Sequence, residues 1–307
     1  MNYTLNILDT AQELNEVEEL QRKVWPGSET DVVPGHVLRA CVHSGGLVVG
    51  AYTLNQVGSE PGPGTRPTRE LVGFVFGFPG FYTTPDGPRL KHCSHMLGVH
   101  PEHRNRGLGY LLKRAQWQMV RHQGIDRITW TYDPLLTPNA HLNIARLGAV
   151  CNTYLVDFYG PMRDGLNAGL PSDRFMVDWW VNTRRVYRRL SKRARLQLDF
   201  NQYLAANALI VTPSITHRDG WRQPPGDEIS IPASPEALLL VEIPLDFNEL
   251  KRHAPGLALE WRLHIRSLFQ KAFASGYLVT DFVHQNLAGS DSPESCYYVL
   301  SHGESTL

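Results

Sequence analysis

The chain has 307 residues, in which 30 Lys and Arg balance 30 Asp and Glu. This length allows one large domain or two ordinary ones, and either would bury a sizeable core. The balanced charge excludes a global field that would attract nucleic acid or an anionic membrane, so only a local cluster could serve that purpose.

The first half of the sequence alternates between helical and strand patterns. Residues 12–25 have helical spacing, and a second helix is predicted from about Gly107 to Gln123. The apolar stripe of this second helix consists of Leu108, Leu111, Leu112, Ala115 and Met119. Strand patterns occupy residues 46–54, 71–78, an apolar run ending at Val99, 127–134 and 149–160, with a short helix at 137–148. We therefore predict a mixed α/β fold.

The second half begins with a Gly-rich connector after residue 160. Helices are predicted around residues 175–197 and 257–276, and strands at 237–244, 277–283 and 296–300. The strand, helix and strand order resembles the first half, so a degenerate structural echo is one interpretation. We predict a first domain at residues 1–160 and a C-terminal α/β extension at 161–307 that packs on it.

The segment MLGVHPEHRNRGLGYLLKRAQ, residues 96–116, joins a strand to a helix through a Gly-rich basic loop. Glycine in a first helical turn costs roughly 0.5–1 kcal/mol relative to alanine. Unpaired amides and the positive end of the helix dipole meet at such a junction, which suits a phosphate. The loop lacks the G-x-x-x-x-G-K-[ST] motif and breaks the dinucleotide fingerprint at its third glycine, which argues against a nucleoside triphosphate or NAD.

These residues resemble the GNAT acyl-CoA N-acyltransferases, whose signature is [RQ]-x-x-G-x-[GA] after the fourth strand. Arg104, Gly107 and Gly109 match it, and the surrounding elements follow the family order over about residues 1–160. The resemblance implies a GNAT fold with splayed central strands and acetyl-CoA or another acyl-CoA as co-substrate. It places coenzyme A on a set of residues that we list as Leu97, Gly98, Val99, Arg104, Asn105, Arg106, Gly107, Leu108, Gly109, Tyr110 and Asn143.

Two residues are candidates for proton transfer in the implied reaction. A lysine-like amine with a pKa near 10.4 is mostly protonated at pH 7. Forming the neutral amine that attacks costs about 4–5 kcal/mol, and a general base would reduce this cost. His95 lies two residues before Leu97 and is expected on the same strand face, so it is predicted to point toward the cleft between the splayed strands and act as that base. The alternative interpretation is a strand histidine that is bonded to a neighbour. The helix at 137–148 lacks the tyrosine usual in the family, so Tyr132 or Tyr154 would have to protonate the thiolate, or the thiolate leaves unassisted.

Other patterns have weaker interpretations. The HCSH segment places Cys93 and His95 on one strand face and His92 on the other, which argues against a shared metal, and no metal is expected. Residues 184–195 carry seven basic side chains, interpreted as a solvated face or a partner of acidic loops, with RNA or the 3′-phosphate of coenzyme A as alternatives. Asn139 is a candidate helix cap. The four dispersed cysteines fit free buried thiols in a reducing compartment.

The sequence as a whole predicts an N-acyltransferase that moves an acetyl or succinyl group to a primary amine of a small molecule, with an amino acid favoured. Arg174 is the candidate anchor for a substrate carboxylate. The alternatives are a non-catalytic acyl-CoA-binding regulator and an RNA-directed acetyltransferase. No apolar run approaches ~18 residues and the N-terminal segment is acidic, so a soluble cytoplasmic protein is expected, without membrane or nucleic-acid partners. Whether the second half pairs with the first or with another subunit, as in a homodimer, is left open.

Overall fold

A computed structural model describes residues 3–27, 29–54, 69–160, 169–191, 197–216, 220–226, 229–232, 237–286 and 293–303. It divides into two compact units, Met1–Thr129 and Trp130–Leu307. The Pro- and Gly-rich segment of residues 58–68, for which the sequence predicts a loop, and most of the predicted connector after residue 160 lie outside the described residues. None of the helices in the described part of the chain has the length and hydropathy that a membrane span requires.

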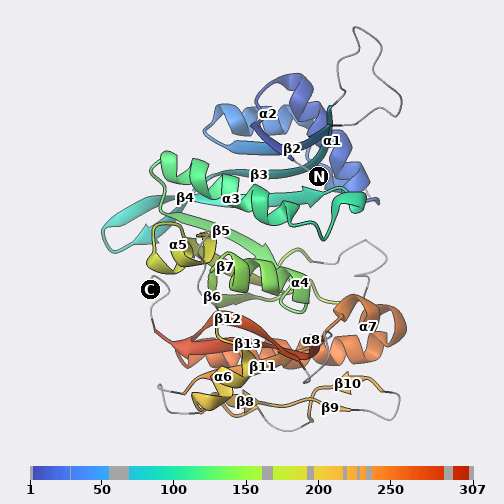
Figure 1. The fold of residues 1–307 in the computed structure, drawn as a ribbon, viewed down its shortest axis with the longest axis vertical. Helices are drawn as coiled ribbons and strands as arrows, with labels where there is room; N and C mark the ends of the chain where they lie inside the picture. Colours follow the sequence, from blue (N-terminus) through green and yellow to red (C-terminus); the bar gives the residue numbers. More distant parts are fainter. Residues whose placement is uncertain are drawn as a thin grey trace. The chain divides into compact units, whose positions relative to one another are not determined.

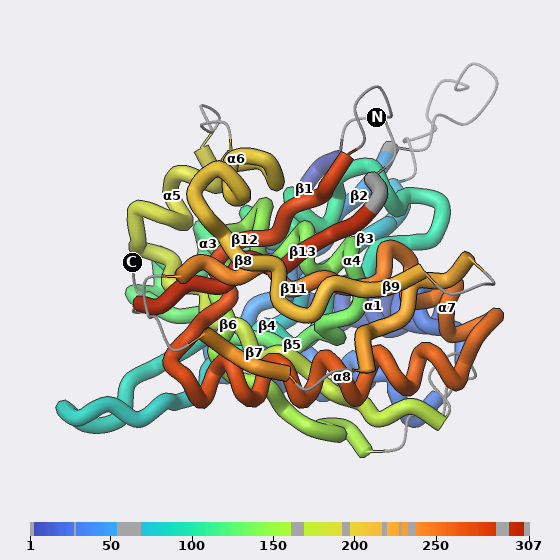
Figure 2. The backbone as a smooth tube through the Cα atoms, turned by 90° about the horizontal axis from the view of Figure 1, so that it is seen from below, coloured from blue at the N-terminus to red at the C-terminus, as the bar shows by residue number. Residues whose placement is uncertain are grey.

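The first unit is built on a sheet whose strands follow chain order (Figure 1). The strands are β1 (Thr4–Ile7), β2 (Leu47–Leu54), β3 (Arg69–Thr84), β4 (Gly87–Val99) and the start of β5 (Arg127–Tyr132). Neighbours are antiparallel except β4 and β5, which are parallel. The β3–β4 pairing continues to Thr84↔Gly87, beyond the last β2–β3 pair, and forms the long hairpin seen in Figure 2. The strands and the parallel crossover confirm the mixed α/β prediction.

Two helices cover one face of this sheet. Helix α1 (Ala11–Val24) begins at a capping box, in which Thr10 Oγ1 accepts from the Glu13 amide and the Glu13 carboxylate accepts from the Thr10 amide. Helix α2 (Gly35–His43), which the sequence patterns did not reveal, follows a short 3₁₀ turn at Glu29–Asp31. Buried side chains of both helices pack against Phe74 and Phe76 of β3.

Helix α3 (Leu108–His122) covers the opposite face, as predicted for residues 107–123. A Cβ atom at Gly73, next to Phe74 on β3, would meet Leu108 and Leu112 at 3.1 and 3.2 Å, so α3 packs on the glycine side of that strand. The predicted stripe is partly wrong, because Leu111 is exposed and Met119 is half-buried. The buried side chains are Leu108, Leu112, Lys113, Gln116, Trp117 and Val120, so two polar residues face inward.

The second unit carries the strand order β7, β6, β12, β13, β11, β8. Their bounds are β6 (Val150–Leu155), β7 (Arg174–Trp180), β8 (Leu209–Val211), β11 (Leu239–Ile243), β12 (Tyr277–Asn286) and β13 (Pro293–His302), while β9 (Ile215–Thr216) and β10 (Arg222–Gln223) form a separate pair. The helices are α4 (Thr137–Ala140), the π-helix η3 (His141–Arg146), α5 (Arg184–Leu190), α6 (Phe200–Ala205), α7 (Phe247–His253) and α8 (Pro255–Ala274). The predicted apolar face of α8, from Trp261 to Ala272, is buried as expected.

The helix predicted around residues 175–197 is wrong in its first part. Residues 174–180 form β7, in which Phe175, Val177 and Trp179 are all fully buried on one face. Period-two burial of aromatic and β-branched residues is the strand pattern, and helix α5 starts only after its N-cap Thr183. The strand predicted at 149–160 also ends early, at Leu155, because Asp157 adopts a left-handed φ of 46°.

The basic run matches both predicted alternatives in part, because Arg184 and Arg188 are exposed while Arg189 pairs with an acidic residue, which lies on a strand and not in a loop. Arg185 donates to the carbonyls of Gly148 and Thr280, and Arg189 donates to the carbonyl of Ala145 and to the Asp281 carboxylate at 2.7 Å. Burial next to Arg189 lowers the pKa of Arg185 to about 10. These two arginines therefore hold α5 to η3 and β12, and residues 192–196 lie outside the described part.

The division into compact units falls earlier than the predicted domain boundary at 160. Strand β6 pairs with β7 and, at Cys151↔Val279, with β12, so residues 150–155 associate with the C-terminal segment. The two domains, as functional modules, stay a prediction. The predicted structural echo differs from the first half in strand order. Strands β4 and β5 are neighbours in the sheet, whereas β13 lies between β11 and β12. All four cysteines are free, as predicted, but only Cys151 and Cys296 are buried, whereas Cys41 and Cys93 are half-buried.

Candidate functional site

Strand β4 presents a free backbone edge near its end. Its register pairs with β5 are His92↔Ile128 and Cys93↔Thr129, and the described pairs of residues 94–99 are with β3. The His100 amide donates to the Val72 carbonyl of β3 at 2.9 Å. Because hydrogen-bonded positions alternate in an antiparallel pair, Leu97 and Val99 direct their amides and carbonyls away from β3.

The loop after β4 is held in place by Arg104. Arg104 follows the 3₁₀ turn η2 (Pro101–His103). Its guanidinium donates from Nε to the Val99 carbonyl at 3.3 Å and from Nη2 to the Val24 carbonyl at 3.0 Å. Arg104, which was predicted to contact coenzyme A, thus donates to backbone carbonyls instead and ties the loop to β4 and α1. The following Asn105 and Gly107 both have left-handed φ values, 59° and 77°.

Helix α3 starts with amides that have no intrahelical acceptor. The bond from the Leu111 amide to the Gly107 carbonyl, 3.2 Å, closes its first turn, so the Leu108 and Gly109 amides precede the ladder. Gly107 is exposed, and a Cβ at this position would meet nothing within 4 Å. The exposed Arg106 lies in the same loop. The predicted coenzyme A loop therefore forms an open helix N-terminus, which is a suitable environment for an anion.

His95 is the extra residue of a β-bulge. The β3–β4 register shifts between Phe76↔Met96 and Gly77↔Ser94, which leaves His95 without a partner. Its ring lies 5.9 and 5.8 Å, centroid to centroid, from those of Phe76 and Phe78. The bulge breaks the alternation, so the expectation that His95 shares a face with Leu97 is wrong. The side chain of His95 is exposed, and partial desolvation beside these rings lowers its pKa, which favours the neutral imidazole at pH 7.

The prediction that Cys93 and His95 lie on one face of β4 and His92 on the other is correct. Cys93 pairs with Phe78 and His95 contacts the same ring, whereas His92 bonds to Gln116 of α3 on the other face. The described residues hold no group of three or more histidine, cysteine or acidic side chains that could bind a metal.

A buried polar cluster beneath the bulge was not predicted. Lys113 and Gln116 of α3 bond to Ser94 and His92 of β4, the two inward residues that precede the bulged His95. The signal available in the sequence was the helical spacing of Lys113 and Gln116 with Leu112 and Val120. Polar side chains in such a stripe are ordinarily assigned to solvent.

The candidate general acids belong to the second unit. The Tyr132 hydroxyl lies 3.1 Å from that of Tyr298, which donates to the Pro134 carbonyl at 2.8 Å. Burial raises the pKa of Tyr132 well above its ordinary value, so proton donation would require this chain of bonds to rearrange. Tyr154 already donates to Asp173 at 2.8 Å.

Two asparagines of this unit were also assigned from the sequence. Asn143 is buried on η3. Asn139 lies within α4, whose N-cap is Leu136, so the capping assignment is wrong.

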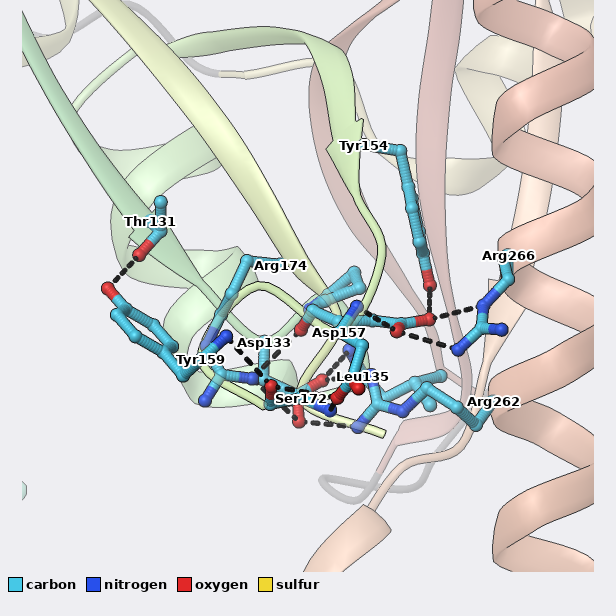
Figure 3. Close-up of polar contacts among 12 residues, drawn as sticks. Thr131, Asp133, Leu135, Tyr154, Asp157, Tyr159, Ser172, Arg174, Arg262 and Arg266 are labelled. Carbon is cyan, nitrogen blue, oxygen red and sulfur yellow. Dashed lines mark hydrogen bonds and ion pairs between the residues drawn. The ribbon is translucent and has the colours of Figure 1, made fainter. Parts of the chain in front are cut away.

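Arg174 is surrounded by its own unit's charges (Figure 3). Its Nη1 donates to the Asp173 carbonyl at 2.8 Å and lies 3.9 Å from Asp133 Oδ2, and its guanidinium lies over the Tyr159 ring. Asp133 receives a bidentate pair from Arg262 at 2.8 and 2.6 Å, and Asp173 receives one from Arg266 at 2.9 and 2.8 Å. These contacts give Arg174 a structural role and do not favour the predicted substrate anchor.

Comparisons of the sequence with protein-family models and with curated proteins gave no match. Among solved structures, the chain is similar to Arabidopsis thaliana NAA60 in complex with acetyl-CoA, with 17% identity and a TM-score of 0.45 over 59% of this chain and 99% of that one. It is also similar to the Escherichia coli ribosomal-protein-S18-alanine N-acetyltransferase, with 14% identity and a TM-score of 0.42 over 59% and 94%. A Desulfovibrio desulfuricans structure described as a GNAT-family acetyltransferase aligns at 15% identity and a TM-score of 0.41 over 59% and 99%. These values leave the activity of this chain to be argued from its own residues.

Proposed function

We propose that this chain is a GNAT-type N-acyltransferase that uses an acyl-CoA, with acetyl or succinyl as the acyl group, to acylate a primary amine of a small molecule. The observation that carries the proposal is the junction of β4 and α3. There, a strand whose Leu97 and Val99 polar groups point away from β3 leads through the loop at residues 100–107 to an open helix N-terminus after the left-handed Gly107.

The junction offers complementary groups to the two halves of coenzyme A. The pyrophosphate would bind to the Leu108 and Gly109 amides, with the helix dipole and Arg106 supplying positive charge. The pantetheine amides would pair with β4 as an added strand does. The outward groups that remain are the amides of Leu97 and Val99 and the Leu97 carbonyl, because the Val99 carbonyl accepts from Arg104. An amide of one of these two residues, rather than that of Gly98, would polarise the thioester carbonyl.

The chemistry requires no covalent enzyme intermediate. The amine nitrogen attacks the thioester carbon, the amine proton passes to neutral His95 directly or through water, and the C–S bond breaks as the tetrahedral intermediate collapses. Coenzyme A leaves as a thiolate, whose ordinary pKa near 8.5 makes it a fair leaving group without an acid. The engaged hydroxyls of Tyr132 and Tyr154 fit unassisted departure.

The acceptor is proposed only as a class, a small primary amine such as an amino acid. The internal contacts of Arg174 remove the support for a carboxylate anchor at that position. The inward Arg185 and Arg189 weaken the RNA-directed alternative, because two of the seven basic side chains contact the chain itself. Turnover distinguishes the proposed enzyme from a binding-only regulator.

Gly107→Ala should weaken coenzyme A binding by about tenfold or more, because a methyl group would stand where the phosphates approach the backbone. Gly124→Ala is a matched control at the other end of α3, since Gly124 has a φ of 75° and Gly107 one of 77°, and both have open space around a Cβ. Each change should cost about 1–2 kcal/mol in left-handed strain. Titration calorimetry on the folded variants decides: equal affinities in both would make the loop merely structural.

A further inference from the structure

The polar cluster beneath the bulge joins α3 to β4 through side chains that solvent does not reach. Lys113 is 2% exposed, Gln116 and His92 are fully buried, and Ser94 is 6% exposed. Lys113 Nζ donates to Ser94 Oγ at 2.8 Å and to Gln116 Oε1 at 3.1 Å. Ser94 Oγ donates to Gln116 Oε1 at 2.9 Å, so three side chains close a ring of hydrogen bonds.

The same cluster contacts β4 at two positions, Ser94 and His92, both of which precede the bulged His95 in the chain. Gln116 Nε2 lies 3.1 Å from His92 Nε2, so the side-chain amide of Gln116 also contacts β4 two residues before Ser94. The His92 ring occupies the space of a missing side chain on β3, because a Cβ at Gly77 would lie 2.2 Å from His92 Nε2. Gly77 is the register partner of Ser94, at the edge of the bulge.

The electrostatics of the cluster favour bonds between neutral groups. Burial lowers the pKa of Lys113 well below its ordinary value, and burial together with Lys113 lowers the pKa of His92 to about 3. A buried polar network is costly when it is only partly satisfied, so its members are restricted to one arrangement. The cluster thus holds the β4 backbone immediately next to His95 in one conformation.

We propose that Lys113, Gln116 and Ser94 are positioning residues, a buried clamp on the β4 bulge that directs His95 toward the amine to be acylated. None of the three touches substrate in this role, which rests on the proposed function. The clamp acts on the reaction through the orientation of His95, whose neighbours Phe76 and Phe78 pack it from β3.

The decisive pair of variants is Ser94→Val and Ser94→Thr. Both add bulk at Cβ in the same buried place, but only threonine keeps the hydroxyl that bonds to Lys113 and Gln116. We expect Ser94→Val to lower kcat by about tenfold or more relative to Ser94→Thr, with unchanged acetyl-CoA affinity. Nuclear magnetic resonance of the His95 ring should show a shifted titration in Ser94→Val only.

A second control separates the clamp from general loss of stability. Gln21 on α1 is also buried and bonds through its amide to the Val33 backbone at 3.0 and 2.8 Å, so Gln21→Met removes a similar bond set. Gln116→Met should lower kcat and shift the His95 titration, and Gln21→Met should do neither. Equal kcat and equal His95 titrations in the two Ser94 variants would overturn the clamp. A wild type that binds acetyl-CoA without turnover would instead refute the proposed function, while the resonance measurement would still test the clamp.

Discussion

Replacing His95 with alanine should lower kcat/KM at pH 7 by roughly 10²–10⁴, the range that a positioned general base contributes. The reduction should shrink as the pH rises, because the free amine becomes abundant and needs the base less. The lowered pKa of His95 has a second consequence. The wild type should lose activity as His95 gains a proton below pH ~6.5, its ordinary value, and the variant should lack that acid limb.

The packing contribution of His95 can be separated from its chemistry. His95→Phe keeps an aromatic ring beside Phe76 and Phe78 but cannot accept a proton, so it should be as slow as His95→Ala and closer to wild type in stability. His122→Ala, an exposed histidine at the end of α3, is the control for a histidine change in the same unit. Equal losses at every pH from 6 to 10, with a lowered melting temperature, would refute the assignment of His95 as the base.

Asp133→Ala should reduce the free energy of unfolding by about 3–5 kcal/mol, because it leaves the buried guanidinium of Arg262 without its counter-charge. Arg262 is 1% exposed and Asp133 is 7% exposed. Replacing both residues, as in Asp133→Leu with Arg262→Met, should recover most of that loss, since two apolar side chains remove the desolvation problem. The exposed pair of Asp86 and Arg89 supplies the control, Asp86→Ala, whose denaturation midpoint should stay near wild type.

The same pair predicts an acid sensitivity. Burial alone would raise the pKa of Asp133, but the charge and hydrogen bonds of Arg262 outweigh it and hold this pKa below its ordinary value. A carboxyl with a lowered folded-state pKa contributes stability above its unfolded pKa of about 3.9 and loses it as the pH falls through the folded value. Chemical denaturation at pH 7 and pH 3 checks this: the gap between wild type and Asp133→Ala should narrow at pH 3, and a constant gap would contradict the ion-pair account.

Most of the elements could be predicted from local patterns. The start of α3 at the Gly-rich loop, the buried face of α8 and the strands β5, β11, β12 and β13 follow from periodicity and turn residues within about 20 neighbouring positions. The missed elements are those whose local signal is ambiguous. Short α2 lacks a side-chain cap, and the apolar strand β7 runs directly toward a helix.

The candidate site was determined only in part by the sequence. The glycines, the basic loop and the following helix identify an anion-binding junction, because each acts through its own backbone. Three features of the site depend on partners 19 to 41 positions away, namely Phe76, Ser94 and Asp133. These features are the face on which His95 lies, the inward direction of Lys113 and Gln116, and the internal pairing of Arg174. A one-residue bulge moves a strand residue to the other face of the sheet. A buried counter-charge allows a charged side chain to lie inside, where spacing alone would predict exposure to solvent. Only the tertiary structure supplies these partners.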